Sequence, residues 1–286
     1  MAIRLTQTVA KSVLTRTSGY LTDVCSHSLQ PYRGCGFGRS LCGVACYVQH
    51  NAWLTRGAQW GSFVEARTNA AEVYAQQVAR ERRFARRTSG RFGIFLSSST
   101  DPFLPQEPRF GVTARVLEAM CADPPDLLIV QTHSHTVADH RDRLRELADR
   151  CELRVHVSFE SDRDRLPGLP PPASPVARRF AAVRTLGAAG LRTVVTVAPL
   201  LPLASPRTFF ERVAESADAV VLDHFIGGDG SADGGRTART PLPAAMEAAA
   251  PGSTELAYRD RMVALAQEIL PGRVGIGRDG FAGRYA

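Results

Sequence analysis

Short apolar runs alternate with amphipathic stretches between about residue 60 and residue 224. The apolar runs are about five or six residues long, are rich in β-branched side chains and predict buried strands. Six strands are predicted, at residues 62–66, 92–97, 127–132, 153–158, 193–198 and 219–224. Between them the apolar positions recur with helical spacing, which predicts helices at residues 71–86, 112–121, 138–150, 174–189 and 206–216.

This alternation predicts an α/β fold with a parallel sheet, because a parallel crossover needs a connection about as long as a helix. Six units favour a partial (βα)6 TIM-type barrel with an N-terminal cysteine loop and a short C-terminal extension. A doubly wound open sheet is the alternative, because strand order cannot be read from the sequence. We expect an N-terminal segment at 1–30, a core at 31–226, and a C-terminal loop, helix and tail at 227–286.

Polar residues gather where the predicted strands stop. In either architecture the carboxyl ends of the strands hold the chemistry. The side chains could contact a ligand there, or they could cap the turn or helix that follows. The polar strand-end residues are Ser99, Thr100 and Asp101, then His133 and His135, then Ser158 and Glu160, and finally Asp223 with His224.

Composition limits the class of protein. With 286 residues and 44% hydrophobic content the chain can bury one large core. No apolar run approaches the ~20 residues that cross a bilayer, and residues 1–15 lack the apolar stretch of a secretory signal, so we expect a cytoplasmic protein without membrane contact. A hydrolase elbow of the form G-x-S-x-G and a P-loop are both missing from the sequence.

The net charge of +7 comes almost wholly from arginine. Such a charge could attract nucleic acid or an acidic substrate. The basic residues are scattered rather than gathered into a run with interleaved aromatics, which favours a solvated arginine-rich surface.

Three of the six cysteines, Cys35, Cys42 and Cys46, lie within twelve residues in a glycine-rich segment. Glycines let a short loop fold so that several thiolates converge on one centre. Three thiolates would leave one iron of a 4Fe-4S cluster open, whereas a structural zinc site needs four ligands and would have to recruit Cys25, His27 or His50. The spacing C-x6-C-x3-C does not decide between the two.

Several further segments occur in a characteristic order. They are residues 27–35 (HSLQPYRGC), Cys46 with Tyr47, residues 99–107 (STDPFLPQE), residues 157–158, Arg179 with Phe180, and residues 198–200 (APL). Together these segments resemble the radical S-adenosylmethionine (SAM) superfamily, and within it the spore photoproduct lyase-like group. The resemblance extends from about residue 26 to residue 202.

The resemblance implies an enzyme in which Cys35, Cys42 and Cys46 hold a 4Fe-4S cluster whose open iron chelates SAM. Reductive cleavage of SAM would yield a 5′-deoxyadenosyl radical that abstracts hydrogen from a substrate, with electrons from a donor such as flavodoxin or ferredoxin. The expected SAM-binding residues are Tyr47, Ser99, Thr100, Asp101, Ser158 and Arg179.

Two departures from the group matter for function. The usual cysteine spacing is C-x3-C-x2-C, so this loop is longer in both gaps. Spore photoproduct lyase also has a hydrogen-donor cysteine where this chain has the serines at 97–99, and a serine O–H bond is too strong for that step. We therefore do not expect thymine-dimer repair; the substrate stays unknown, with an anionic molecule as one possibility. The alternative is a non-catalytic nucleic-acid-binding module that contains zinc.

Overall fold

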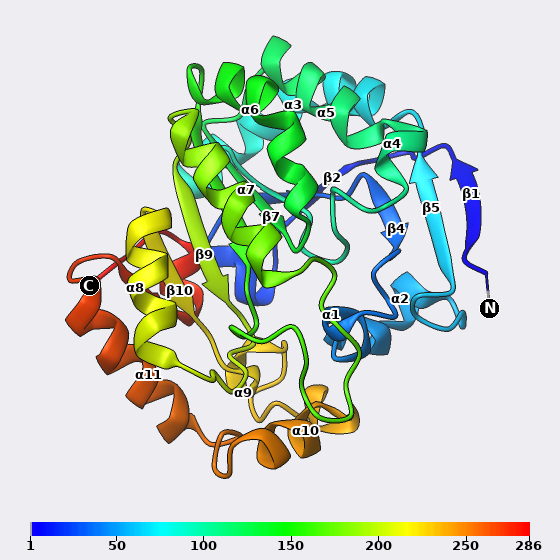
Figure 1. The fold of residues 1–286 in the computed structure, drawn as a ribbon. Helices are drawn as coiled ribbons and strands as arrows, with labels where there is room; N and C mark the ends of the chain where they lie inside the picture. The colour runs from blue at the N-terminus through cyan, green and yellow to red at the C-terminus, as the bar shows by residue number, and fades with distance from the viewer. Residues whose placement is uncertain (1) are drawn as a thin grey trace.

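The computed structural model describes residues 2–286 and is built around one large sheet (Figure 1). In spatial order the sheet runs β11-β10-β9-β8-β7-β6-β3-β2. All neighbours from β3 to β11 are parallel, and β2 pairs antiparallel with β3 at the edge. The strands are β2 (Leu14–Arg16), β3 (His27–Leu29), β6 (Gly93–Leu96), β7 (Leu127–Thr132), β8 (Glu152–Ser158), β9 (Thr193–Val197), β10 (Ala219–Leu222) and β11 (Val274–Ile276).

The parallel strands follow one another in space in the same order as along the chain. Because crossovers between parallel strands are right-handed, an unreversed order puts the successive helices on one face of the sheet. The doubly wound alternative, whose strand order reverses at a switch point, is therefore wrong. The long helices of this layer are α3 (Ala70–Ser89), α5 (Val112–Ala122), α6 (Arg141–Ala148), α7 (Val176–Ala188), α8 (Pro206–Ser216) and α11 (Leu256–Ile269).

The first predicted strand is real but belongs elsewhere. It forms β5 (Phe63–Arg67), which lies in a separate three-stranded sheet between β1 (Arg4–Thr8) and β4 (Tyr32–Gly34). Our expectation that residues 62–66 open the main sheet is wrong, and β3 takes that place beside β6. Since β3 has only three residues and includes His27 and Ser28, it carries no apolar run that sequence periodicity could detect.

The expected helices form close to their predicted bounds, with one exception. The predicted helix 138–150 begins as the 3-10 helix η3 (His135–His140) and becomes α-helical only in α6. The C-terminal tail also holds more structure than expected, because β11 extends the parallel sheet and α12 (Gly277–Phe281) follows it. Within the part of the chain that is described, every helix is too short or too polar to span a lipid bilayer.

The remaining elements are short, and most of them surround the carboxyl ends of the strands. In Figure 1 the arrowhead of β9 points toward the side of the molecule that holds α1, α9 and α10. These short elements are η1 (Gly19–Asp23), α1 (Leu41–Val44), η2 (Tyr47–His50), α2 (Ala52–Thr55), α4 (Glu107–Phe110), α9 (Phe225–Gly228), η4 (Thr237–Arg239) and α10 (Leu242–Ala249).

Alternate side chains of the strands point to opposite faces of the main sheet. Val155 and Val157 of β8 pack with Phe180 and Leu186 of α7 in the core under the helices. The opposite, inward face carries a smaller apolar cluster that includes Phe95, Ile129, Val194, Val221 and Phe281. Beyond these apolar residues, the inward positions nearer the carboxyl ends are polar, and they line the candidate site.

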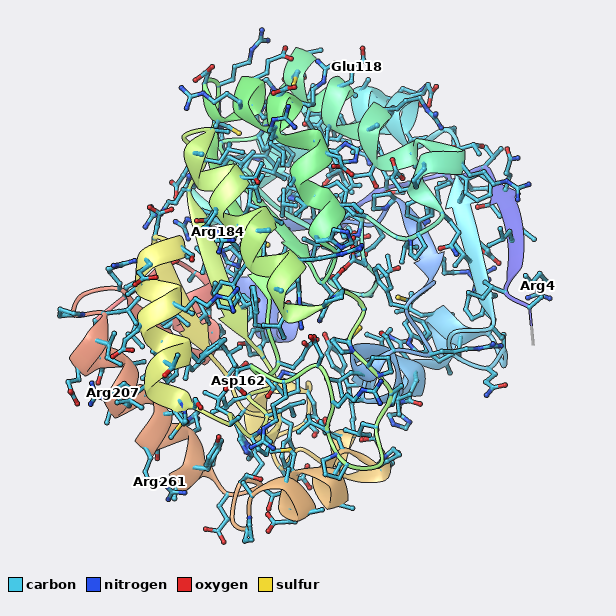
Figure 2. The ribbon with its side chains drawn as sticks, in the orientation of Figure 1. Arg4, Glu118, Asp162, Arg184, Arg207 and Arg261 are labelled. Atoms are coloured by element: carbon cyan, nitrogen blue, oxygen red, sulfur yellow. The ribbon has the colours of Figure 1, made fainter. Side chains whose placement is uncertain are left out.

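Exposed arginines are spread over the molecule. Figure 2 labels Arg4 on β1, Arg184 on α7, Arg207 on α8 and Arg261 on α11, and these four lie on different parts of the surface. This spread agrees with a solvated arginine-rich surface rather than one basic face.

A buried glutamate joins the N-terminal strands to α3 and gives a testable pH dependence. Glu81 Oε2 lies 2.9 Å from Arg16 Nε and 3.2 Å from His27 Nε2, and Oε1 lies 2.8 Å from Arg80 Nε. Burial alone would raise the pKa of Glu81, but the hydrogen bonds from Arg16, His27 and Arg80 lower it to about 2. Because the folded-state pKa is depressed, the stabilisation is full above the unfolded value of about 4.3 and is lost as pH falls through about 2.

We expect Glu81→Gln to lower the free energy of unfolding by about 2 kcal/mol at pH 7 and to flatten its decline between about pH 4.5 and 2. Urea unfolding across that range checks this. Glu118→Gln, which changes an exposed glutamate of α5, is the control. Parallel stability curves for wild type and Glu81→Gln would refute the assignment.

Candidate active site

A cavity of about 430 Å³ lies at the carboxyl ends of β6 to β10. Its inner wall consists of inward-facing strand-end residues, namely Ser97, Gln131, His133, Ser158, Glu160, Ala198 and Asp223. The opposite wall is formed by the cysteine loop and by part of the Gly-rich segment 228–237. The strand ends that were predicted to hold chemistry therefore meet around one space.

The cysteine loop folds back on itself through close backbone contacts. Cys35 follows β4, Cys42 lies in α1, and Cys46 follows α1. A Cβ added to Gly38 would lie 2.1 Å from Gly61 Cα, and one added to Gly43 would lie 2.2 Å from the Phe37 carbonyl oxygen. Only glycine fits at these two positions, so the glycines allow the turn that brings the three cysteines to the cavity.

All three cysteine side chains line the cavity. Burial raises the pKa of the Cys35 and Cys42 thiols to about 12, and that of Cys46 to about 11. After burial, Cys46 is a further cause of the raised pKa of Cys35, and Cys35 is a further cause of the raised pKa of Cys42. Buried thiols of this kind ionise when a metal replaces the proton.

The sulfur spacing tests which metal group would fit. Around one zinc with Zn–S bonds of about 2.3 Å, tetrahedral sulfurs lie about 3.8 Å apart. In an iron-sulfur cluster each thiolate binds a different iron, so the sulfurs are farther apart. Among residues 2–286, the three Sγ atoms are not all within 4.8 Å of one another. The three sulfurs as they stand are therefore not gathered around a single tetrahedral zinc.

The residues named as extra zinc ligands have other positions. The Cys25 thiol donates to the His27 carbonyl oxygen at 3.2 Å, and the His27 ring pairs with Glu81 of α3. His50 is exposed at the end of η2. None of these three is among the described residues that line the cavity.

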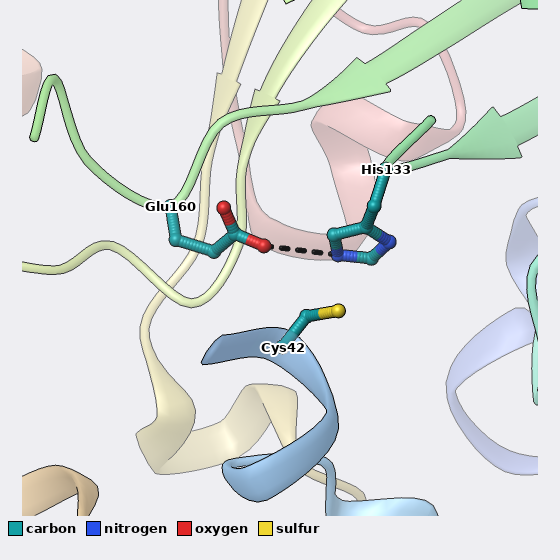
Figure 3. Close-up of side chains that lie close together, drawn as sticks. All are labelled: Cys42, His133 and Glu160. Carbon is teal, nitrogen blue, oxygen red and sulfur yellow. Dashed lines mark ion pairs between the residues drawn. The ribbon is translucent and has the colours of Figure 1, made fainter. Parts of the chain in front are cut away.

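One cysteine lies beside a histidine and a glutamate (Figure 3). Cys42 Sγ, a His133 ring nitrogen and a Glu160 carboxylate oxygen all lie within 4.8 Å of one another. His133 Nε2 is 3.2 Å from Glu160 Oε1, and its Nδ1 is 3.6 Å from Asp101 Oδ2. Burial opposes protonation of the imidazole, but Cys42, Asp101 and Glu160 together hold the pKa of His133 well above its ordinary value.

Arg179 lies behind this group. It is 1% exposed, and its Nη1 donates to Glu160 Oε2 at 2.8 Å and to the Ser158 carbonyl oxygen. Although burial opposes ionisation, Arg179 and His133 keep the pKa of Glu160 below its ordinary range. Arg179 is not among the described residues that line the cavity, so it acts on the cavity through Glu160.

The segment after β6 forms hydrogen bonds with both the start of the cysteine loop and the end of β7. Thr100 Oγ1 donates to the Gly34 carbonyl oxygen at 2.6 Å, next to Cys35. Asp101 accepts from the Phe103 and His133 amides and from Thr132 Oγ1, at 2.7 to 2.8 Å. Ser99, Thr100 and Asp101 all line the cavity, but the hydrogen bonds of Asp101 show that it also organises the turn.

Ser158 and Tyr47 also line the cavity. Ser158 Oγ accepts from Gln131 Nε2 at 2.6 Å and lies 3.1 Å from Thr196 Oγ1. The Tyr47 hydroxyl lies 3.5 Å from the Ser98 carbonyl oxygen, and the residue is 37% exposed. Each residue expected to bind SAM therefore borders the cavity, except Arg179. The strand-end residue His135 lies outside it, with its Nδ1 2.9 Å from Ser174 Oγ.

Sequence reasoning missed two residues of the site. Gln131 precedes His133 by two positions, so strand periodicity could have placed it on the same face. Tyr20 carried no signal, because it lies on η1 and reaches the cavity only through tertiary packing against Asp223, 203 residues later in the chain.

The fold and site together define a class: a singly wound parallel sheet with a cysteine loop at the carboxyl ends of its strands. Among solved structures, this chain is similar to spore photoproduct lyase complexed with dinucleoside spore photoproduct, with a TM-score of 0.64, 15% identity, and coverage of 96% of this chain and 81% of that chain. A doubly substituted spore photoproduct lyase with bound AdoMet and dinucleoside spore photoproduct matches with a TM-score of 0.63, 14% identity and the same coverage.

These likenesses confirm the resemblance to the spore photoproduct lyase-like group at the level of the fold. No protein-family model matches the sequence. A search of curated proteins finds no relative.

Proposed function

We propose that this chain is a radical SAM enzyme. The observation that carries the proposal is the convergence of Cys35, Cys42 and Cys46 on one cavity at the strand ends of a fold shared with spore photoproduct lyase. In this proposal the main sheet is the partial barrel of such enzymes. Residues 31–226 form most of the radical SAM core, and the sheet adds β2 and β3 before them and β11 after them.

The three thiolates would hold a 4Fe-4S cluster and leave one iron without a protein ligand. When bound, the cluster and SAM supply reductive cleavage of the sulfonium and a 5′-deoxyadenosyl radical for hydrogen abstraction. The apolar wall residues of the cavity, including Phe37, Leu41 and Leu201, would exclude water from this chemistry.

The residues expected to bind SAM have different roles in this proposal. Tyr47 would pack beside the adenine of SAM, while Ser99, Thr100 and Ser158 would bind other polar groups of SAM. Asp101 and Arg179 would act through their neighbours, since Asp101 holds the His133 backbone and Arg179 holds Glu160. His133 lies between the carboxylates of Asp101 and Glu160 and would fix the position of Cys42.

The proposed cofactors also indicate the compartment and the electron donor. An oxygen-sensitive cluster suits the cytoplasm, and its reduction requires an electron donor such as flavodoxin or ferredoxin. Ser97, Ser98 and Ser99 line the cavity in the stretch that corresponds to the hydrogen-donor cysteine of spore photoproduct lyase, so we propose a reaction other than thymine-dimer repair.

Anaerobic reconstitution with iron and sulfide is expected to give a brown protein with about four irons per chain. Dithionite plus SAM should then release 5′-deoxyadenosine, measured by liquid chromatography. Zinc near one equivalent without iron or sulfide, in well-folded protein, would instead identify the zinc-containing nucleic-acid-binding module. Such a module should also bind a random oligonucleotide with an affinity that falls as salt rises.

A further inference from the structure

The part of the cavity wall that follows β10 contains a buried carboxylate without a basic partner. Asp223 follows β10 and is 8% exposed. Its Oδ2 accepts from the Tyr20 hydroxyl at 2.7 Å, and its Oδ1 accepts from the His224 amide at 2.9 Å. Among the described residues no basic side chain lies within ion-pair distance, 4.0 Å, of this carboxylate. Burial raises the pKa of Asp223, which shows that the charged form lacks full compensation.

Two glycines leave space beside this carboxylate. A Cβ at Gly228 would lie 2.8 Å from Asp223 Oδ2, and one at Gly277 would lie 3.3 Å from Oδ1. Any other residue at position 228 would press against the oxygen that faces Tyr20. Both Asp223 and Gly228 line the cavity.

The other three carboxylates on the cavity wall are already engaged. Asp101 accepts from two amides and a hydroxyl, and Glu160 pairs with Arg179 and His133. Asp229 accepts from the Thr237 amide and from the amide and hydroxyl of Ser231. Arg236 is the one arginine among the described cavity-lining residues, and it is exposed at the rim.

Unpartnered polar atoms also occur on other strands that line the cavity. Ser97 is 3% exposed, and its Oγ has no hydrogen-bond partner among the described residues. Its φ of 67° is in the left-handed region, which costs a non-glycine residue free energy and is typical of functional sites. Gln131 Nε2 donates to Ser158 and Thr196, which leaves Gln131 Oε1 buried without a partner. Both residues line the cavity.

We propose that Tyr20, Ser97, Gln131 and Asp223 form an amine subsite, which binds a cationic ammonium group of the substrate with Asp223 as its counter-ion. An ammonium carries three donors and no acceptor, which matches a carboxylate, an amide oxygen and a hydroxyl. It also supplies the positive charge that a buried carboxylate needs. A phosphate or carboxylate substrate would meet repulsion here instead, so the structure argues against an anionic group at this end of the cavity.

The amine subsite depends on the proposed function only for the reaction that would follow substrate binding. Its test measures binding alone and therefore needs neither an iron-sulfur cluster nor SAM cleavage. Benzylamine, benzyl alcohol and benzoate have the same ring and differ in charge. Their dissociation constants for the purified full-length chain at pH 7 are measured by ligand-observed NMR titration. We expect benzylammonium to bind at least tenfold more tightly than the other two, and Asp223→Asn to weaken it at least tenfold.

Glu118→Gln removes an exposed carboxylate outside the cavity and is the matched control, expected to bind like wild type. The wild-type series tests the proposal even if Asp223→Asn does not fold. No preference for benzylammonium over benzoate, or undetectable binding of benzylammonium, would overturn it. An equal weakening of SAM binding by Asp223→Asn would also overturn it, because Asp223 would then belong to the cofactor site.

Discussion

Replacing Cys42 with alanine is expected to remove most of the iron from anaerobically reconstituted protein and to reduce 5′-deoxyadenosine formation to background. Two thiolates cannot hold a 4Fe-4S cluster at three corners, and a cluster that is incompletely ligated is lost on desalting. The effect should exceed that of substituting any cavity-wall residue other than Cys35 and Cys46. Iron and sulfide analysis, together with the visible absorbance of the cluster, measures the loss independently of activity.

Cys42 is the informative cysteine because its position in the loop departs from the usual spacing. It lies on α1 beside His133 and Glu160, so a mononuclear site of cysteine, histidine and glutamate is the competing interpretation. Zinc bound at such a site would be lost in Cys42→Ala and retained in Cys46→Ala. A cluster requires both cysteines, so iron should be lost equally in the two variants.

Cys151→Ser is the matched control, because Cys151 is partly buried and lies just before β8, outside the cavity. It should keep the iron content of wild type. If Cys42→Ala kept its iron and still cleaved SAM, Cys42 would not be a cluster ligand.

Replacing Arg179 with methionine is expected to lower the free energy of unfolding by about 3–5 kcal/mol. The Arg179 and Glu160 side chains are 1% and 3% exposed, so the substitution leaves a buried carboxylate with only His133 beside it. It also removes the hydrogen bond to the Ser158 carbonyl oxygen and the contact of the guanidinium with the Phe159 ring at 4.8 Å. Methionine fills much of the vacated volume, which limits the cavity contribution.

Urea unfolding at pH 7 measures the loss. The double variant Arg179→Met/Glu160→Gln should recover at least half of it, because a neutral amide does not need a counter-ion. The Glu160→Gln variant alone separates the cost of the glutamate change. A loss below about 1 kcal/mol in Arg179→Met would show that the buried pair contributes little to stability.

Much of the main sheet could be predicted from the sequence. Strands β7 and β9, predicted at 127–132 and 193–198, are largely buried on both faces, so their apolar runs are easily detected. Helix α8 forms at the residues predicted, 206–216, because Pro206 can occupy its first turn. The polar strand ends could also be predicted, since the carboxyl ends of parallel strands lie at one edge.

Short strands and long-range partners could not be predicted. β3 and β11 have three residues each, and their pairing energy comes from a neighbour already in the sheet rather than from their own side chains. The ring of Tyr20 packs edge-on to Phe281, 6.1 Å between centroids, and its hydroxyl donates to Asp223. Local sequence holds no information about such contacts between the two ends of the chain.

By itself, the sequence determined the alternation of strands and helices, the cysteine loop with its glycines, and the polar residues at the strand ends, because each depends on residues close together in the chain. The tertiary structure alone decided which strand opens the sheet, that Arg179 supports Glu160 from behind, and that Tyr20 meets Asp223. These outcomes depend on strand order and packing. Both are set by burial of distant segments against one another rather than by local conformational preference.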